Sequence, residues 1–105
     1  MISNAEVTRK KTTRGAILTT LYTSQSAPMP VNTLELVLMQ GNPGIGGEMI
    51  PAINYLVDRG YIRVVERGGA EVNPMRGMMV RITDVGQDVI EGTISDAGLL
   101  FARED

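Results

Sequence analysis

Apolar residues in the first part of the chain repeat with the period of an α-helix. Four of them share one helical face: Ile17, Leu18, Leu21 and Tyr22. This spacing predicts a helix within residues 7–24, because it gives the segment one continuous apolar side. The stretch SQSAPMP follows, and its two prolines are expected to end the helix.

A second helix is predicted within VNTLELVLMQG. Asn32 is expected to cap this helix, with Glu35 three residues later as the partner in a capping box. Its short apolar face comprises Leu34, Val37 and Leu38. Gly41 is expected to end it, since glycine is common just beyond the last helical residue.

A third helix is predicted to begin near Gly47 or Glu48. Its apolar face comprises Met49, Ile53, Leu56 and Val57. Pro51 fits only in the first turn, where backbone N–H groups have no helical partner, so it restricts where the helix starts. Gly60 is expected to end the helix.

The remaining pattern predicts two strands and a last helix. YIRVVERG and MMVRITD are typical of strands, and the turn-rich GGAEVNPMRG between them indicates a hairpin. Thr83 is expected to cap a helix in DVGQDVIEG. The apolar face of that helix comprises Val85, Val89 and Ile90.

This order of elements predicts an α+β winged helix-turn-helix fold, with a three-helix core, a two-stranded β wing and a C-terminal helix. We expect one domain over residues 1–105, with its core at 8–92 and a C-terminal extension at 93–105. The extension contains the apolar residues Leu99, Leu100 and Phe101, which would be exposed to solvent if they packed against nothing. We therefore expect them to dock on the domain or across a dimer interface.

The glycine-rich GNPGIGGE between the second and third helices raises the alternative of a nucleotide-binding loop. A phosphate loop requires a lysine after its last glycine, but Glu48 stands there and would repel a phosphate. The dinucleotide fingerprint is also incomplete, and no strand is predicted before it. We therefore expect no nucleotide, and a connector in which Pro43 and Gly44 turn the chain while Ile45 packs inward.

The amino-acid composition limits the reactions that the side chains could carry out. The chain has no cysteine and no histidine, which excludes disulfides, thiol catalysis and histidine-based acid–base chemistry. We expect a protein that is not an enzyme and has no metal or other cofactor. Apolar runs are far shorter than the ~20 residues of a membrane span, and no secretory signal is visible, so we expect no membrane contact and a cytoplasmic location.

Charge is distributed unevenly around a net value of −2. Residues 1–14 and 59–83 are basic, whereas residues 15–58 contain no lysine or arginine and residues 84–105 are acidic. Basic patches of this kind can bind nucleic acid even when the whole chain is slightly negative.

Two motifs resemble those of winged-helix regulators of the MarR, PadR and ArsR kind. Their pattern L-x-x-x-G-Y-I, at the end of the recognition helix and the start of the wing, is matched by Leu56, Gly60, Tyr61 and Ile62. Their post-wing L-T-x-x-G is matched by Ile82, Thr83 and Gly86. The longer pattern T-x-x-G-x-D-V-x-x-G, from Thr83 to Gly92 with a further glycine at Gly98, resembles a small winged-helix family of Mu-like phages and prophages. The resemblance covers most of residues 10–98.

The resemblance implies binding of double-stranded DNA by a homodimer that acts as a phage or prophage regulator or accessory protein. In such folds the third helix enters the major groove and the wing contacts the backbone. The expected wing contacts are Arg63, Arg67, Arg76 and Arg81. The expected recognition-helix contacts are Glu48, Asn54 and Tyr55, and the expected N-terminal contacts are Lys10, Lys11 and Arg14.

The third helix departs from this pattern, since residues 45–58 contain no basic side chain and Glu48 and Asp58 would be repelled by phosphates. The alternative is therefore a winged helix that binds another protein and no DNA. In that case the wing arginines only keep the hairpin soluble and pair with Glu66 and Glu71. Met75, Met78 and Met79 are expected to pack in the core or at a dimer interface rather than form an adaptable binding surface. Asp84 and Asp88 are expected to form an acidic, solvated face.

Overall fold

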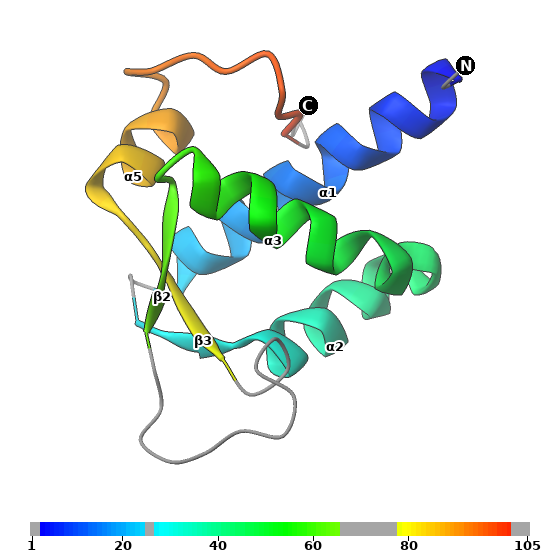
Figure 1. Cartoon of the computed structure of the whole chain (residues 1–105), viewed down its shortest axis with the longest axis horizontal. Helices are drawn as coiled ribbons and strands as arrows, with labels where there is room; N and C mark the ends of the chain where they lie inside the picture. Colours follow the sequence, from blue (N-terminus) through cyan, green and yellow to red (C-terminus); the bar gives the residue numbers. More distant parts are fainter. Residues whose placement is uncertain (1–2, 25–26, 66–77, 102–105) are drawn as a thin grey trace.

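The computed structural model describes residues 3–24, 27–65 and 78–101. In this part of the chain the fold is α+β, with four α-helices, one short 3₁₀ helix and a small antiparallel sheet (Figure 1). The elements are α1 (Asn4–Thr23), β1 (Met29–Pro30), α2 (Val31–Gly41), η1 (Pro43–Glu48), α3 (Met49–Asp58), β2 (Ile62–Val65), β3 (Met79–Ile82) and α5 (Asp84–Ile90).

The sheet has three strands among the described residues, in the order β1-β3-β2. The predicted antiparallel pairing of β2 with β3 is confirmed, and Arg63 stands opposite Arg81 in its register. The sequence did not predict β1, which adds to the other edge of β3 through Met29 and Pro30. A strand of two residues has no alternating pattern to recognise, and proline is compatible with a strand at the edge of a sheet.

The start of α2 differs from the prediction. Asn32 does not cap this helix, which begins at Val31, two residues earlier than such a cap implies, and has no side-chain cap. The N–H of Val31 instead donates to the carbonyl of Met78 at 2.9 Å, just before β3. A backbone partner from a distant segment thus replaces the local cap, and the Asn32 side chain accepts from the N–H of Thr33.

The glycine-rich stretch is a connector between two helices, as predicted, but it forms the 3₁₀ helix η1 rather than an open turn. Asn42 precedes η1, and its side chain accepts from the N–H of Gly44 at 3.3 Å. Ile45 is buried, as expected. The third residue of α3 is Pro51, so the proline does lie in the first turn.

Gly60 ends α3 in the left-handed conformation, with φ of 77°. Its N–H donates to the carbonyl of Val57, and the N–H of Tyr61 donates to that of Leu56, both at 3.0 Å. These two bonds form a Schellman motif, which satisfies carbonyls at the helix end and turns the chain into β2. The prediction that Gly60 ends the helix is confirmed.

Thr83 caps α5, as predicted. Its side-chain oxygen accepts from the N–H of Gly86 at 3.1 Å and donates to the carbonyl of Gly60 at 2.6 Å, so it joins α5 to the turn after α3. A Cβ on Gly86 would lie 2.2 Å from the carbonyl oxygen of Tyr61, so the close contact requires glycine. Val89 is buried and Ile90 packs against the core, as predicted. Val85 is exposed instead, and Gly86 is buried.

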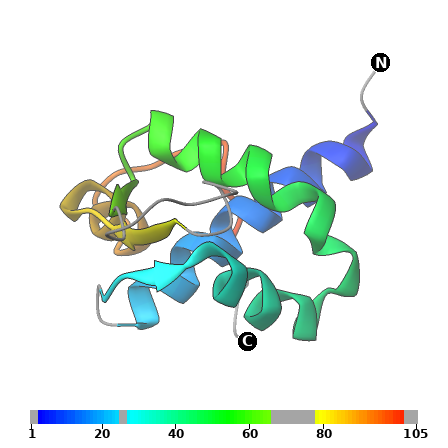
Figure 2. The same ribbon diagram turned by 60° about the horizontal axis from the view of Figure 1, so that its bottom comes forward.

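The core lies where α1, α2 and α3 meet the inner side of the sheet (Figure 2). Its fully buried side chains include Ile17, Leu18, Leu21, Leu34, Ile53, Leu56, Val80 and Ile82. Val37 was predicted to join the apolar face of α2, but it is exposed, and Leu36 and Met39 beside it are exposed as well. The outer side of α2 is therefore more apolar than a solvated helix requires.

The segment after α5 passes over α3 and α1 as irregular chain (Figure 1). Leu99 is buried in the core, and the N–H of Leu100 donates to the carbonyl of Lys11 at 3.1 Å. Leu100 and Phe101 stay exposed, so only part of the predicted apolar group docks on the domain. Met78 packs against the core as expected, whereas Met75 lies outside the described residues.

Candidate nucleic-acid interface

The outer side of the sheet presents two arginines. Arg63 on β2 and Arg81 on β3 are both exposed and stand directly opposite each other. Directly opposite residues have Cβ atoms about 5 Å apart, and like charges in this position destabilise a sheet. Within residues 3–24, 27–65 and 78–101 neither guanidinium takes part in an ion pair. The other two predicted wing residues, Arg67 and Arg76, lie outside the described residues.

A depression of about 270 Å³ lies beside this pair, between the sheet and the start of α5. Both arginines line it, together with Thr83, Asp84 and Gln87. The lining residues thus carry two guanidinium groups and one carboxylate. The balance is cationic, and the groups are hydrogen-bond donors suited to the oxygens of a phosphate.

The exposed face of α3 carries no basic side chain. Asn54 and Asp58 point away from the core. Glu48, just before the helix, forms an ion pair with Arg9 of α1 at 4.0 Å, so its charge is partly compensated. Of the three residues predicted to read bases, only Asn54 is both exposed and free of charge.

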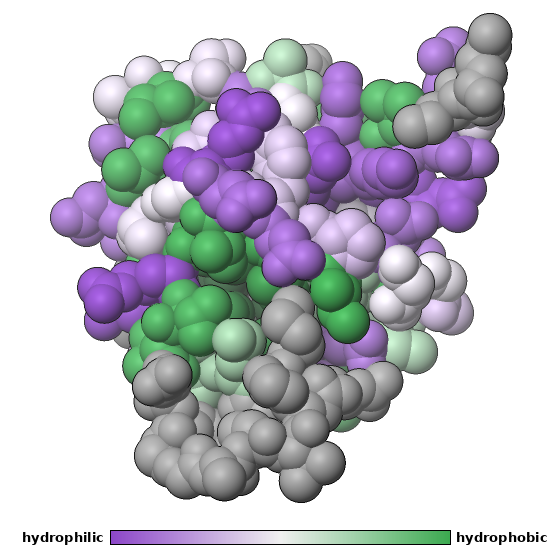
Figure 3. Space-filling view, viewed as in Figure 1, coloured by the Kyte–Doolittle hydropathy of each residue, from purple (hydrophilic) through white to green (hydrophobic). Residues whose placement is uncertain are grey.

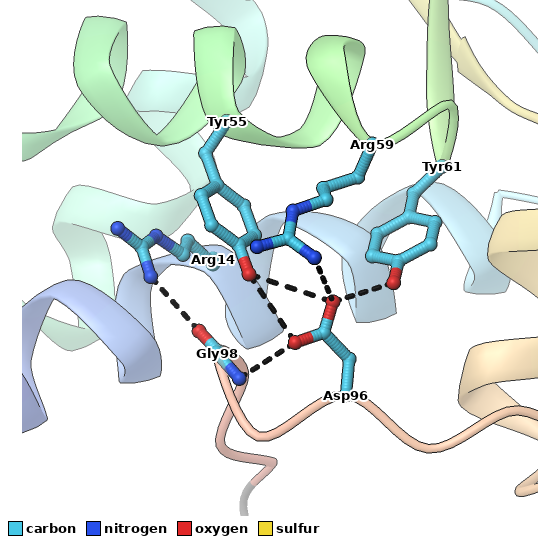
Figure 4. A network of polar contacts seen from close by, with 6 residues as sticks. All are labelled: Arg14, Tyr55, Arg59, Tyr61, Asp96 and Gly98. Atoms are coloured by element: carbon cyan, nitrogen blue, oxygen red, sulfur yellow. Dashed lines mark hydrogen bonds and ion pairs between the residues drawn. The ribbon is translucent and has the colours of Figure 1, made fainter.

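Tyr55, the third residue predicted to read bases, lies on a different flank of α3. Its hydroxyl group lies 3.2 Å and 3.4 Å from the two carboxylate oxygens of Asp96. The guanidinium carbons of Arg14 and Arg59 lie 3.8 Å and 4.8 Å from the centre of its ring, so two cations flank the tyrosine (Figure 4). The structure therefore places Tyr55 beneath the C-terminal segment.

Arg14, predicted as an N-terminal DNA contact, also has partners in this region. Its guanidinium donates to the carbonyl of Gly98 at 3.0 Å. Lys10 and Lys11 are partly exposed on α1, and their side chains form no ion pair with other described residues. Hydrophilic side chains are the most frequent over α3 and the first turns of α1 on this side of the molecule, with some apolar side chains among them (Figure 3). Ile50 of α3 is one exposed apolar residue.

Asp96 is the centre of a network of polar contacts that the sequence pattern did not predict. Its side chain is only 7% exposed. It accepts from the hydroxyl of Tyr61 at 2.5 Å and from the N–H of Gly98 at 2.6 Å, and it lies 3.9 Å from the guanidinium of Arg59. These contacts tie the C-terminal segment to the end of α3 and the start of β2 (Figure 4).

The network shifts the pKa values of its members. Burial of Asp96 by itself raises the pKa, but the hydrogen bonds from Tyr61, Gly98 and Tyr55 and the charge of Arg59 outweigh it, so the pKa lies below its ordinary value. Burial and then the Asp96 carboxylate raise the pKa of Tyr61 to about 12. Asp96 is therefore an anion and Tyr61 a neutral donor over the whole physiological range.

One local signal for this network was present in the sequence. Tyr55 and Arg59 are four residues apart, and such a pair meets on one face of a helix. Gly98 was noted only as part of the phage-family pattern, and nothing indicated Asp96, because contact between the C-terminal segment and α3 depends on the tertiary fold.

No family model, curated protein or solved structure matches the chain. Across the described ranges, no three or more Asp and Glu side chains gather as a metal site would require. Within the same residues, no helix is both long enough and apolar enough to cross a bilayer.

Proposed function

We propose that this protein is a winged-helix protein that binds double-stranded DNA mainly through its sheet. The order of elements supports the fold: two helices joined by a short connector, then an antiparallel pair of strands and a last helix. The motif from Thr83 to Gly92 supports a phage or prophage origin, with a role as a regulator or accessory DNA-binding protein. We infer a binding protein rather than an enzyme, because histidine and cysteine are absent.

The observation that carries this proposal is the facing pair of Arg63 and Arg81. Two opposed guanidinium groups repel each other, and no carboxylate among the described residues forms an ion pair with either. A DNA phosphate between them would remove the repulsion and release condensed counterions, which is the main source of affinity for nucleic acid.

The face of α3 predicts modest sequence selectivity. Asp58 repels the backbone, and Asn54 is the only exposed amide positioned to read a base edge. Affinity then comes mainly from phosphates, and phosphate contacts carry little information about sequence. We expect binding to depend strongly on salt and weakly on the DNA fragment.

The test is a fluorescence-anisotropy titration with duplex DNA at several salt concentrations. Replacing Arg63 and Arg81 together by glutamine removes two phosphate contacts. We expect affinity to fall on all fragments, and the slope of log K against log salt to become shallower by about 2.

The matched control replaces Arg9 and Arg59 by glutamine, which removes the same charge away from the sheet. The proposal requires the control to retain most of the wild-type slope. If both double variants lose the same affinity, binding depends only on net charge and the sheet is not the site.

A second candidate function is protein binding, and the outer side of α2 favours it. Leu36 is 64% exposed, and Val37 and Met39 beside it are exposed too. Exposed apolar groups of this kind mark protein contacts, including those of a homodimer. Sedimentation of the wild-type protein and of Leu36→Lys tests this function. A concentration-dependent dimer that the substitution abolishes, with no DNA binding at low salt, would favour it over the first.

A further inference from the structure

A second cationic hollow lies away from the sheet arginines. It has a volume of about 630 Å³ and is bordered by α1, by the end of α3 and by the C-terminal segment. The residues that matter for its chemistry are Lys11, Arg14, Arg59, Tyr55, Tyr61 and Asp96. It lies over the network drawn in Figure 4.

The charge of this hollow is not balanced by its own residues. Lys11, Arg14 and Arg59 contribute three positive charges, and Asp96 is the only carboxylate in the lining. That carboxylate already accepts from two tyrosine hydroxyls and one backbone N–H. Its contact with Arg59, at 3.9 Å, is the longest of the group, so Arg59 keeps donors for another anion.

The cations are also held in place. The guanidinium of Arg14 is fixed by the ring of Tyr55 and by the carbonyl of Gly98, and that of Arg59 lies on the other side of the same ring. The ammonium group of Lys11 has no ion-pair or hydrogen-bond partner among the described residues. A site with oriented donors loses less entropy on binding than one built from free side chains.

We propose that this hollow binds the phosphate group of a small phosphate monoester. A monoester carries a charge of about −2 near neutral pH, which matches the surplus of two positive charges. A phosphate within a nucleic acid backbone carries one charge and matches it less well. Arginine donates to phosphate oxygens in a bidentate geometry, and lysine adds a point charge.

The experiment follows the backbone amides of Ala97 and Gly98 by NMR during titration with inorganic phosphate and with methyl phosphate, at constant ionic strength set by chloride. We expect a saturable shift of these amides with both probes. Replacing Lys11 and Arg59 by glutamine should weaken binding at least about tenfold, since it removes two of the three positive charges in the lining. The same replacement at Arg63 and Arg81 should leave it unchanged.

Three results would overturn the proposal. The first is a chemical shift change that does not saturate, and the second is a change that persists in the variant lacking Lys11 and Arg59. The third is displacement of inorganic phosphate by dimethyl phosphate and duplex DNA as effectively as by methyl phosphate. The last result would make the hollow part of a nucleic acid footprint. The NMR spectra also report whether each variant is folded, so a lost signal is not mistaken for lost binding.

Discussion

The arginines around Tyr55 and the arginines on the sheet lie in opposite environments. Arg14 and Arg59 flank an aromatic ring, and each contacts an oxygen of the C-terminal segment. Arg63 and Arg81 face each other across two strands, with no ion pair in the described part of the chain. The first pair contributes to the fold, whereas the second makes the sheet less stable than it would be with neutral residues. The sheet pair is therefore the better candidate for DNA binding.

The largest effect should come from separating the C-terminal segment from Tyr55. In Gly98→Ala the new Cβ would lie 2.0 Å from the Tyr55 hydroxyl oxygen, so either the Tyr55 side chain, which lies between Arg14 and Arg59, or the segment must move. We expect the free energy of unfolding to fall by about 3 kcal/mol, as overpacked sites do. Urea denaturation measures this. Gly47→Ala is the control, because its Cβ would meet no atom within 4 Å.

If Gly98→Ala and Gly47→Ala cost the same, the C-terminal segment is not part of the folded core. The comparison between the two arginine pairs would then fail, since Arg14 and Arg59 would have no fixed partners.

A smaller effect is expected from Asp96→Asn, which keeps the shape of the side chain but removes its charge. Hydrogen bonds to a buried charged group contribute about 2 kcal/mol, so we expect a loss of that size at neutral pH. The folded pKa of Asp96 is lowered, so its contribution is complete above the unfolded value of 3.8 and is lost as the pH falls through the folded value. Wild type and variant should therefore converge in acid.

Stability measured against pH for both proteins checks this prediction. At alkaline pH the raised pKa of Tyr61 has the opposite effect on stability. The contribution of Tyr61 to the free energy of unfolding is complete below the ordinary pKa of 10.0, and it is lost as the pH rises towards about 12. Tyr61→Phe should remove that alkaline loss. A difference between wild type and Asp96→Asn that does not change with pH would show that the carboxylate charge is irrelevant.

The smallest effect has the opposite sign. Arg81→Thr removes the repulsion from Arg63 and introduces a residue that favours strands, so we expect the protein to become more stable by about 0.5 kcal/mol at low salt. The gain should shrink as salt screens the charges. Thermal denaturation at two salt concentrations measures it. Arg59→Gln is the comparison and should give no gain, because its charge lies near Asp96.

Local chemistry made several elements predictable. Gly60 ends α3 and Thr83 caps α5 because left-handed glycine and a capping hydroxyl act on backbone groups within a few residues. Asn32 does not cap α2, because contacts distant in sequence set the start of this helix. Met29 and Pro30 pair with β3, and the N–H of Val31 donates to the carbonyl of Met78, so the helix begins at Val31.

The residues of the candidate sites also differ in how far the local sequence predicted them. Arg63 and Arg81 face each other because the two strands pair in an ordinary hairpin register. The sequence pattern was therefore sufficient to predict both as residues of the wing strands. The role of Tyr55 was not predictable, because its position on α3 suggested a surface residue, whereas Asp96, 41 residues later, contacts its hydroxyl.

By itself the sequence determined where α3 ends, where α5 begins and which side chains are absent, since these depend on residue identity and near neighbours. Only the tertiary structure decided which arginines have partners among the described residues and which form no ion pair there. Arg14 finds its partner 84 residues away, at Gly98, once the C-terminal segment has docked. No local pattern encodes such a contact, because it forms only when burial of Leu99 brings the two ends of the chain together.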